Sequence, residues 1–263
     1  MSTVQKAISV LGCFSIETQE LGVTEIARML GANKVIVHRL LRDLEAGGLV
    51  EQDPDSRRYR LGYELLRLAS IRQSGANLLR AAIPHLDQLR DRTGETAHLS
   101  VIRRDCVLRI YVVQTRHYLR FSADVGDESP LHTTAAGKTL LAYVDQSDWP
   151  YHLAASKARF PNEADVDPAT LYNELETIRR DGHAVDDQMF RPLLRAFGAP
   201  IRDSSGRVIA AATTGGVASR IPDDRIPELI AAITETVAAI SRDLGYCHHP
   251  ASADNGKIEK DIT

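Results

Sequence analysis

Apolar positions in the first sixty residues recur at helical spacing and are separated by glycines. The segment 4–15 keeps the spacing of a helix of about three turns that ends near Ser15. A second short helix is predicted over 24–31, which ends at a glycine suited to a left-handed cap, and a third over 34–48, which ends at a glycine pair. Two short helices around a tight turn are typical of a helix-turn-helix.

A β-hairpin is predicted directly after the third helix. The segments 49–52 and 58–61 have the composition of strands, and Asp-Pro-Asp-Ser at 53–56 has strong turn chemistry. A hairpin in this place is the wing of a winged helix. Residues 1–70 are therefore predicted to form a winged helix-turn-helix domain that binds DNA.

Residues 64–93 have helical periodicity with one interruption. Pro84 lacks a backbone N–H, so it predicts a kink or a new helix start. The apolar stripe around Leu78 and Leu79 fits packing against the same chain and, equally, against a second copy in a dimer. We interpret residues 71–93 as a helical linker.

From Glu95 onward, β-branched and aromatic residues in partial alternation indicate strands. Interspersed helices predict a larger mixed domain over 94–247, followed by a polar, disordered tail over 248–263. The fold class is therefore α/β, in the wide sense that includes α+β. The expected strands are 96–102, 107–113, 118–123, 183–188, 197–203 and 208–214, and the expected helices are 135–144, 168–180 and 222–244.

Composition excludes several classes of protein. Of 263 residues, 43% are hydrophobic and 25% are charged, which is ordinary for a globular chain. No apolar run reaches the ~18 residues of a membrane span. The three cysteines form no CxxC pair, which argues against a disulfide framework and a zinc site. We expect a cytoplasmic protein without a cofactor or a bound metal.

The net charge of −3 argues against a wholly basic nucleic-acid binder, but it hides a local pattern. Residues 1–70 hold nine basic and nine acidic side chains, yet 26–42 hold four basic side chains and no acid, and 57–60 hold three arginines. The third helix and the wing are thus basic where contact with phosphates requires it. The alternative is a solvated helix face beside an ordinary exposed turn.

Helix geometry divides the expected DNA contacts. Side chains near the N-terminal end of a recognition helix meet base edges in the major groove, and others meet phosphates. We expect base contacts from Asn33, Lys34, Val35, Val37 and His38, phosphate contacts from Arg39 and Arg42, and backbone or minor-groove contacts from Arg57 and Arg58, with Tyr59 beside them.

Several longer motifs follow one another in a set order. They are VTEIARMLG (23–31), KVIVHRLLRDLEAGGLVEQDP (34–54), RRYRLG (57–62), GDESPLHTTAAGKTLLAY (126–143) and IRRDGHAVDDQMFRPLLRAFGAPIRDSSGRVIAAATTGGVASR (178–220). Over about residues 3–246 the chain resembles the IclR family of bacterial transcription regulators. Because several motifs match in order, this resemblance is far more specific than a lone helix-turn-helix.

The resemblance implies partners as well as a fold. It implies a homodimer, or a dimer of dimers, on double-stranded operator DNA, and a GAF-like second domain whose small organic effector changes operator affinity. It implies effector contacts from Ala135, Ala136, Asp186, Leu194, Ala196, Thr213 and Gly215, with Tyr118 and Phe121 as an apolar wall. Repression and activation both stay open.

Departures from the family pattern affect both sites. Val35 and Ile36 stand where the family usually has Ser-Thr, so two hydroxyls are absent and Val35 becomes a candidate contact for a thymine methyl. Fewer polar groups in the second domain favour a less carboxylate-focused, aromatic effector. The replacements there are Gln188 for the usual Glu, Leu193 for Gly, Ala196 for Cys and Gly215 for Ser.

An enzyme that processes small molecules, with an appended DNA-binding domain, is the main alternative. Asp186 and Asp187 are adjacent, so on a strand they point to opposite faces and cannot act together on one substrate. No common catalytic motif is present. His132 and Lys138 fit structural roles better, and Cys247-His248-His249 is a weak metal signal. We therefore expect a regulator and not an enzyme.

Overall fold

The computed structural model describes residues 2–15, 18–74 and 77–247. The chain divides into two compact units, Met1–Ala76 (unit 1) and Asn77–Thr263 (unit 2). Each unit has its own hydrophobic core, so each is treated by itself below. The expected tail, with His248 and His249, lies outside the described residues.

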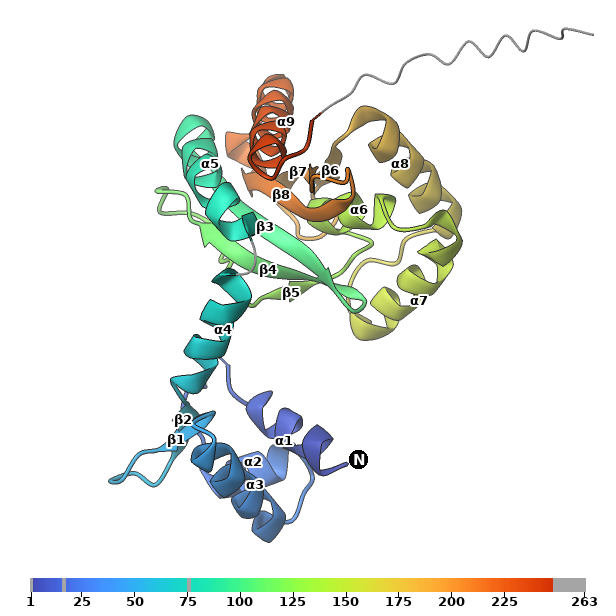
Figure 1. The fold of residues 1–263 in the computed structure, drawn as a ribbon. Helices are drawn as coiled ribbons and strands as arrows, with labels where there is room; N and C mark the ends of the chain where they lie inside the picture. Colours follow the sequence, from blue (N-terminus) through green and yellow to red (C-terminus); the bar gives the residue numbers. More distant parts are fainter. Residues whose placement is uncertain (1, 16–17, 75–76, 248–263) are drawn as a thin grey trace, which may run out of the picture. The chain divides into compact units, whose positions relative to one another are not determined.

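Unit 1 is a helix-turn-helix followed by a hairpin, as predicted (Figure 1). Its elements are α1 (Thr3–Leu11), α2 (Val23–Met29), α3 (Lys34–Ala46), β1 (Val50–Gln52), β2 (Tyr59–Leu61) and α4 (Glu64–Ser74). α1 ends before Ser15, the expected end, because Gly12 closes its last turn by donating its N–H to Ile8. Asn33 caps α3 and accepts the N–H of Val35 at 2.8 Å.

The apolar stripe of α3 forms the centre of the unit 1 core. Val37 and Leu41 are fully buried there, together with Ile26 of α2. The wing joins the same core through Tyr59, which is only 1% exposed. The backbone of Tyr59 also exchanges two hydrogen bonds with that of Leu21, at 2.8 and 2.9 Å. The opposite side of α3 is left exposed to solvent.

Unit 2 is built on one antiparallel sheet with the strand order β5-β4-β3-β8-β7-β6. Its strands are β3 (Thr96–Arg103), β4 (Cys106–Val113), β5 (Glu128–Ser129), β6 (Ala184–Asp187), β7 (Leu194–Arg202) and β8 (Val208–Val217). Its helices are α5 (Asn77–Thr93), α6 (Ala135–Ala142), α7 (Trp149–Arg159), α8 (Pro168–Asp181) and α9 (Ile226–Asp243). Short 3-10 turns occupy Gln146–Asp148, Ala218–Arg220 and Asp223–Arg225.

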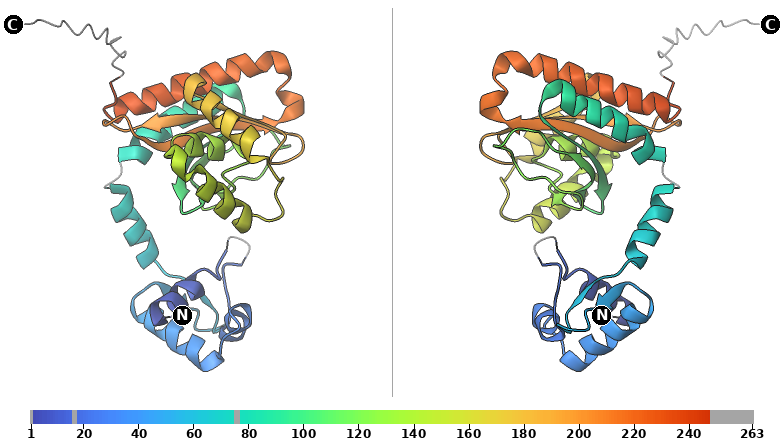
Figure 2. Two further views of the ribbon diagram at one scale, coloured as in Figure 1. Left: turned by 90° about the vertical axis from the view of Figure 1, so that its right-hand side faces the viewer. Right: turned by 90° about the vertical axis from the view of Figure 1, so that its left-hand side faces the viewer.

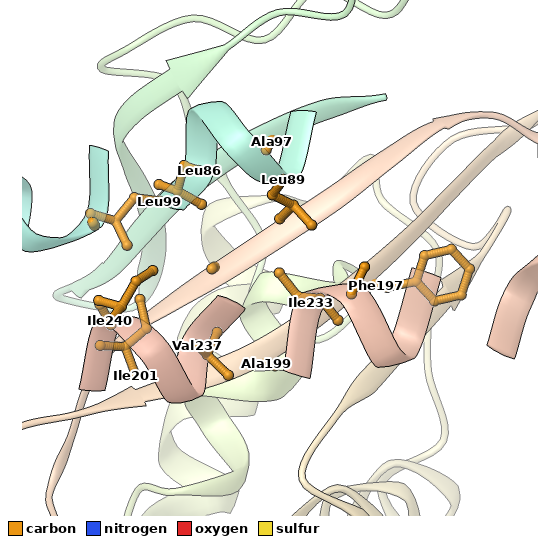
Figure 3. Close-up of a cluster of buried hydrophobic side chains, with 14 of the residues drawn as sticks. Leu86, Leu89, Ala97, Leu99, Phe197, Ala199, Ile201, Ile233, Val237 and Ile240 are labelled. Carbon is orange, nitrogen blue, oxygen red and sulfur yellow. The ribbon is translucent and has the colours of Figure 1, made fainter. Parts of the chain in front are cut away.

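The helices of unit 2 lie on both faces of the sheet (Figures 1 and 2). α5 and α9 pack side by side over one face, and α6, α7 and α8 cover the other. Successive side chains of each strand point to opposite faces of the sheet. Residues 97 and 99 of β3 and 197, 199 and 201 of β7 face α5 and α9 (Figure 3). The residues between them point to the opposite face, where the cavity described below lies.

The expected strand over 118–123 is wrong. These residues belong to a loop between β4 and β5, in which Tyr118 is 99% and Leu119 67% exposed. Their alternation misled the prediction, because these residues join no strand of the sheet and four of the six are exposed. The loop is fastened instead by polar contacts, such as the one that Gln114 Nε2 donates to the carbonyl of Ala123 at 2.5 Å.

Two helices also differ from expectation. Pro84 lies inside α5, exposed, and starts no new helix there. α5 packs into the core of unit 2 through Leu86 and Leu89, so this part of the expected linker belongs to the larger unit. The sequence prediction missed α7, whose buried side chains are only Trp149, Leu153 and Ser156, too few for a clear stripe.

Within the described ranges, no helix has the length and apolar character that crossing a bilayer requires.

Candidate functional site

The exposed side of α3 presents a basic surface. Lys34, His38, Arg39 and Arg42 are exposed there. In the described part of unit 1, the side chains of Lys34, Arg39 and Arg42 have no hydrogen bond or ion pair, so their charges are open to a partner. Val35 lies among them with 76% of its side chain exposed. An uncovered valine beside free cations suits a surface that meets both phosphates and base methyl groups.

Two expected DNA contacts are wrong, because they belong to the core. Val37 is 0% and Tyr59 1% exposed, so neither side chain can reach a ligand on the surface. Val37 lies one helical turn from Leu41 on the inward side of α3, which the prediction of base contacts overlooked. Asn33 keeps its place at the start of α3, but its side-chain oxygen is occupied by the cap.

The wing arginines differ in their surroundings. Arg57 is exposed, has a positive φ of 59°, and takes part in no ion pair among the described residues. Arg58 Nη2 lies 2.8 Å from Glu25 Oε2, and Arg60 Nη2 lies 3.3 Å from Glu51 Oε2. Only Arg57 of the three thus presents an uncompensated charge.

A cavity of about 320 Å³ opens on the sheet face opposite α5 and α9. Strand residues form its floor, and the loops between β4 and β5 and between β6 and β7 form its sides. Its lining consists of Thr96, His98, Arg109, Thr115, Arg120, Phe121, Ser122, Ala123, Asp127, Glu128, Phe190, Arg191, Leu194, Ala196, Gly215, Gly216 and Arg220.

The structure brings some of the expected effector residues to this cavity and not others. Phe121, Leu194, Ala196 and Gly215 line it. Tyr118 does not, because its side chain is 99% exposed, so it forms no wall. Ala135, Ala136, Asp186 and Thr213 are buried and do not line the cavity.

Asp186 acts on the cavity indirectly. Its Oδ1 accepts the N–H groups of Met189 at 2.9 Å and Phe190 at 3.2 Å, and its side chain is 1% exposed. Burial raises the pKa of Asp186, against the lowering effect of these two hydrogen bonds. The carboxylate therefore holds the loop that carries Phe190 and Arg191. The adjacent Asp187 points outward to Arg195 at 2.7 Å, as expected for neighbours on a strand.

Sequence reasoning missed most of the charged lining. Arg109 pairs with Asp127 at 2.9 Å, Arg220 with Glu95 at 2.7 Å and Arg191 with Glu163 at 2.6 Å. Arg120 also lines the cavity and has no carboxylate partner among the described residues. A ligand in the cavity would thus meet one uncompensated cation.

His98 forms a neutral polar point on the cavity floor. Its Nδ1 lies 3.3 Å from Ser100 Oγ. Burial, assisted by the nearby charge of Arg109, lowers the pKa of His98 to about 3. A signal for His98 existed in the alternation of β3, since it lies between Ala97 and Leu99, but only the pairing of β3 with β8 places it beside Thr213.

The groups considered for catalysis have structural partners. His132 is 1% exposed and its Nδ1 lies 3.0 Å from Ser156 Oγ. Lys138 is 2% exposed, pairs with Glu174 at 2.5 Å and donates to the carbonyl of Val185 at 2.7 Å. These contacts agree with the structural roles predicted for both. In the described ranges, no cluster of His, Cys, Asp and Glu could hold a metal ion.

Comparison with known proteins covers nearly the whole chain. The family model for the bacterial transcriptional regulator IclR C-terminal domain matches residues 72–242, and that for the IclR helix-turn-helix domain matches residues 3–54. The glycerol operon regulatory protein of Streptomyces coelicolor is 32% identical over 247 residues, which cover 93% of this chain and 97% of that protein.

Solved structures show the same architecture. A putative IclR transcriptional regulator from Silicibacter sp. TM1040 superposes with a TM-score of 0.80 at 30% identity, covering 95% of this chain and 98% of that chain. An IclR homologue from Microbacterium hydrocarbonoxydans, crystallised with 4-hydroxybenzoate, has a TM-score of 0.81 at 23% identity and covers 92% of this chain and 99% of that chain.

Proposed function

Because the chain belongs to the IclR family of bacterial transcriptional regulators, with a helix-turn-helix DNA-binding domain, we propose that unit 1 reads a duplex operator through α3 and the wing, under control of a small organic effector bound in unit 2. The observation that carries this proposal is that one chain has both an exposed basic helix, α3 in unit 1, and a cavity in unit 2.

The DNA contacts divide by exposure. Lys34, Val35 and His38 lie at the exposed start of α3 and read base edges, and Val35 contacts a thymine methyl. Arg39 and Arg42, further along α3, contact phosphates together with Arg57 of the wing. A homodimer would present two such surfaces to a palindromic operator, with half-sites spaced by the distance between the two recognition helices.

A mobility-shift series tests this assignment. Replacing Arg39 by Ala should weaken binding to every duplex and flatten the salt dependence, whereas replacing Lys34 or His38 should also relax base preference. The protein is first used to select its duplex from a randomised pool. Unchanged binding by all three variants would contradict the proposed surface.

The proposed effector is a small aromatic acid. Phe121 and Phe190 give the cavity apolar aromatic walls, and Arg120 supplies an uncompensated cation for one anionic group. A volume of about 320 Å³ is at the lower end for sites of this kind and suits a single ring. The 4-hydroxybenzoate complex of the M. hydrocarbonoxydans homologue supports the choice, although the two sequences are only 23% identical.

Thermal-shift measurements with benzoate, 4-hydroxybenzoate and small aliphatic keto acids test the effector class. A ligand that binds the folded state alone raises the unfolding temperature with concentration, so benzoates should stabilise the protein and keto acids should not. Stabilisation by the keto acids alone would overturn the aromatic assignment.

The effector must also distinguish two states of the protein. An effector changes the affinity for DNA only if it binds the DNA-binding conformation and the non-binding conformation with different affinities. The size of that difference limits the size of the change. The same duplex titrated with and without saturating benzoate measures this coupling. The proposal further includes a cytoplasmic, non-enzymatic protein that acts as a dimer or a dimer of dimers, which sedimentation with and without DNA would test.

A further inference from the structure

Arg58 joins the wing to the start of α2. Its Nη2 lies 2.8 Å from Glu25 Oε2 and donates to the carbonyl oxygen of Glu20 at 3.0 Å. Glu20 precedes α2 and Glu25 lies in its first turn, whereas Arg58 directly precedes β2. One guanidinium thus holds two points of the segment that leads into the helix-turn-helix.

Glu25 has a second contact that fixes its carboxylate. The same Oε2 accepts the N–H of Gly22, the N-cap of α2, at 2.7 Å. The hydrogen bond from Gly22 and then that from Arg58 hold the pKa of Glu25 below its ordinary value, so the group is ionised at neutral pH. At neutral pH the contact is therefore a charged pair.

The neighbouring backbone shows that this is a junction. Tyr59, next to Arg58, exchanges two backbone hydrogen bonds with Leu21, at 2.8 and 2.9 Å. In the described part of unit 1, no other β-bridge connects the hairpin to the chain before α2. Arg58 and this single bridge thus act at one place, where the direction of the wing relative to α2 is set.

We propose that Arg58 is a positioning residue for DNA recognition, which with Glu25 fixes the wing against the helix-turn-helix so that Arg57 meets the duplex. This inference rests on the proposed binding of DNA by unit 1. In this role Glu25 strengthens DNA binding in spite of its negative charge. The sequence-based expectation for Arg58 was a direct contact with the DNA backbone, and the two roles have opposite consequences for Glu25.

Three variants separate the two roles. Glu25→Gln removes a negative charge and keeps an acceptor for Gly22, Arg58→Gln removes the cation, and the double variant restores the net charge of the wild type. If the residues act through charge alone, Glu25→Gln tightens binding and the double variant binds like the wild type. If they act as a pair, all three weaken binding by a similar factor, about two- to fivefold for each half-site, because an exposed pair is a modest contribution.

The measurement is fluorescence anisotropy with a duplex that the wild type selects from a randomised pool. Asp55→Asn is the matched control, since Asp55 is an exposed wing acid whose carboxylate has no partner in the described structure, and its removal should tighten binding. Far-UV circular dichroism follows the helices of each variant.

The outcomes are distinct. Weakened binding by Glu25→Gln and by the double variant, with unchanged helix content, supports the pair. Tighter binding by Glu25→Gln, a double variant equal to the wild type, or loss of helix content in Glu25→Gln would each overturn it. Failure of the wild type to select any duplex would instead refute the proposed function of unit 1.

Discussion

Acidification should destabilise unit 2 through His98. Burial and the charge of Arg109 lower the pKa of His98 to about 3 in the folded protein, whereas an unfolded chain exposes an imidazole of ordinary pKa, ~6.5. Between these two values the unfolded state binds a proton that the folded state does not. Because the pKa of this base is lower in the folded protein, protonation favours the unfolded state. The free energy of unfolding is therefore highest above pH ~6.5 and decreases as the pH falls below that value.

The magnitude follows from proton linkage. One extra proton on the unfolded chain changes the free energy of unfolding by ~1.4 kcal/mol for each pH unit. Between about pH 7.5 and about pH 5 the loss is ~2 kcal/mol for His98 alone. A His98→Gln variant has no such group, so the difference in stability between wild type and variant should shrink or reverse by that amount on acidification.

Urea unfolding at the two pH values measures the effect. Trp149 is the only tryptophan of the chain, is 1% exposed, and lies in the core of unit 2, so its fluorescence follows that unit. His117→Gln, at an exposed position, serves as the control. A wild-type minus His98→Gln difference that is the same at both pH values would refute the assigned protonation of His98.

Three further outcomes are expected. Arg39→Ala should lower the slope of log Kd against log salt concentration by ~0.9 for each protomer on the duplex, as anisotropy titrations would measure; an unchanged slope would exclude a phosphate contact. Asp186→Ala should leave DNA binding intact and abolish the effector response, because the loop carrying Phe190 loses its acceptor; a response like that of the wild type would contradict the assigned role of Asp186 in holding that loop. Leu99→Ala, in the core shown in Figure 3, should cost ~2–5 kcal/mol in urea unfolding followed by Trp149, and a loss well under 1 kcal/mol would contradict its assigned burial.

Local patterns were enough to predict the elements of unit 1. These elements depend on residues that are close together in the chain, so the sequence predicts them directly. The signals are the apolar spacing of α3, the glycines at helix ends and the turn at 53–56. The local charge count also pointed to α3 and the wing, although the whole chain has a net charge of −3. The loop at 118–123 failed for the converse reason, because alternation predicts a strand only where a sheet buries one face.

Tertiary structure decided which of the predicted side chains are available. Val37 and Tyr59 lie on the right elements, but packing directs them into the core, and Arg58 is taken up by Glu25, a partner more than thirty residues away. The cavity likewise depends on the pairing of β3 with β8, which brings Thr96 beside Gly215, two residues of its lining. The sequence alone determined the elements of unit 1, the family and the basic surface, since these depend on local spacing and charge. Only the fold decided which groups meet, because contacts between distant segments depend on strand register and on the direction of each side chain.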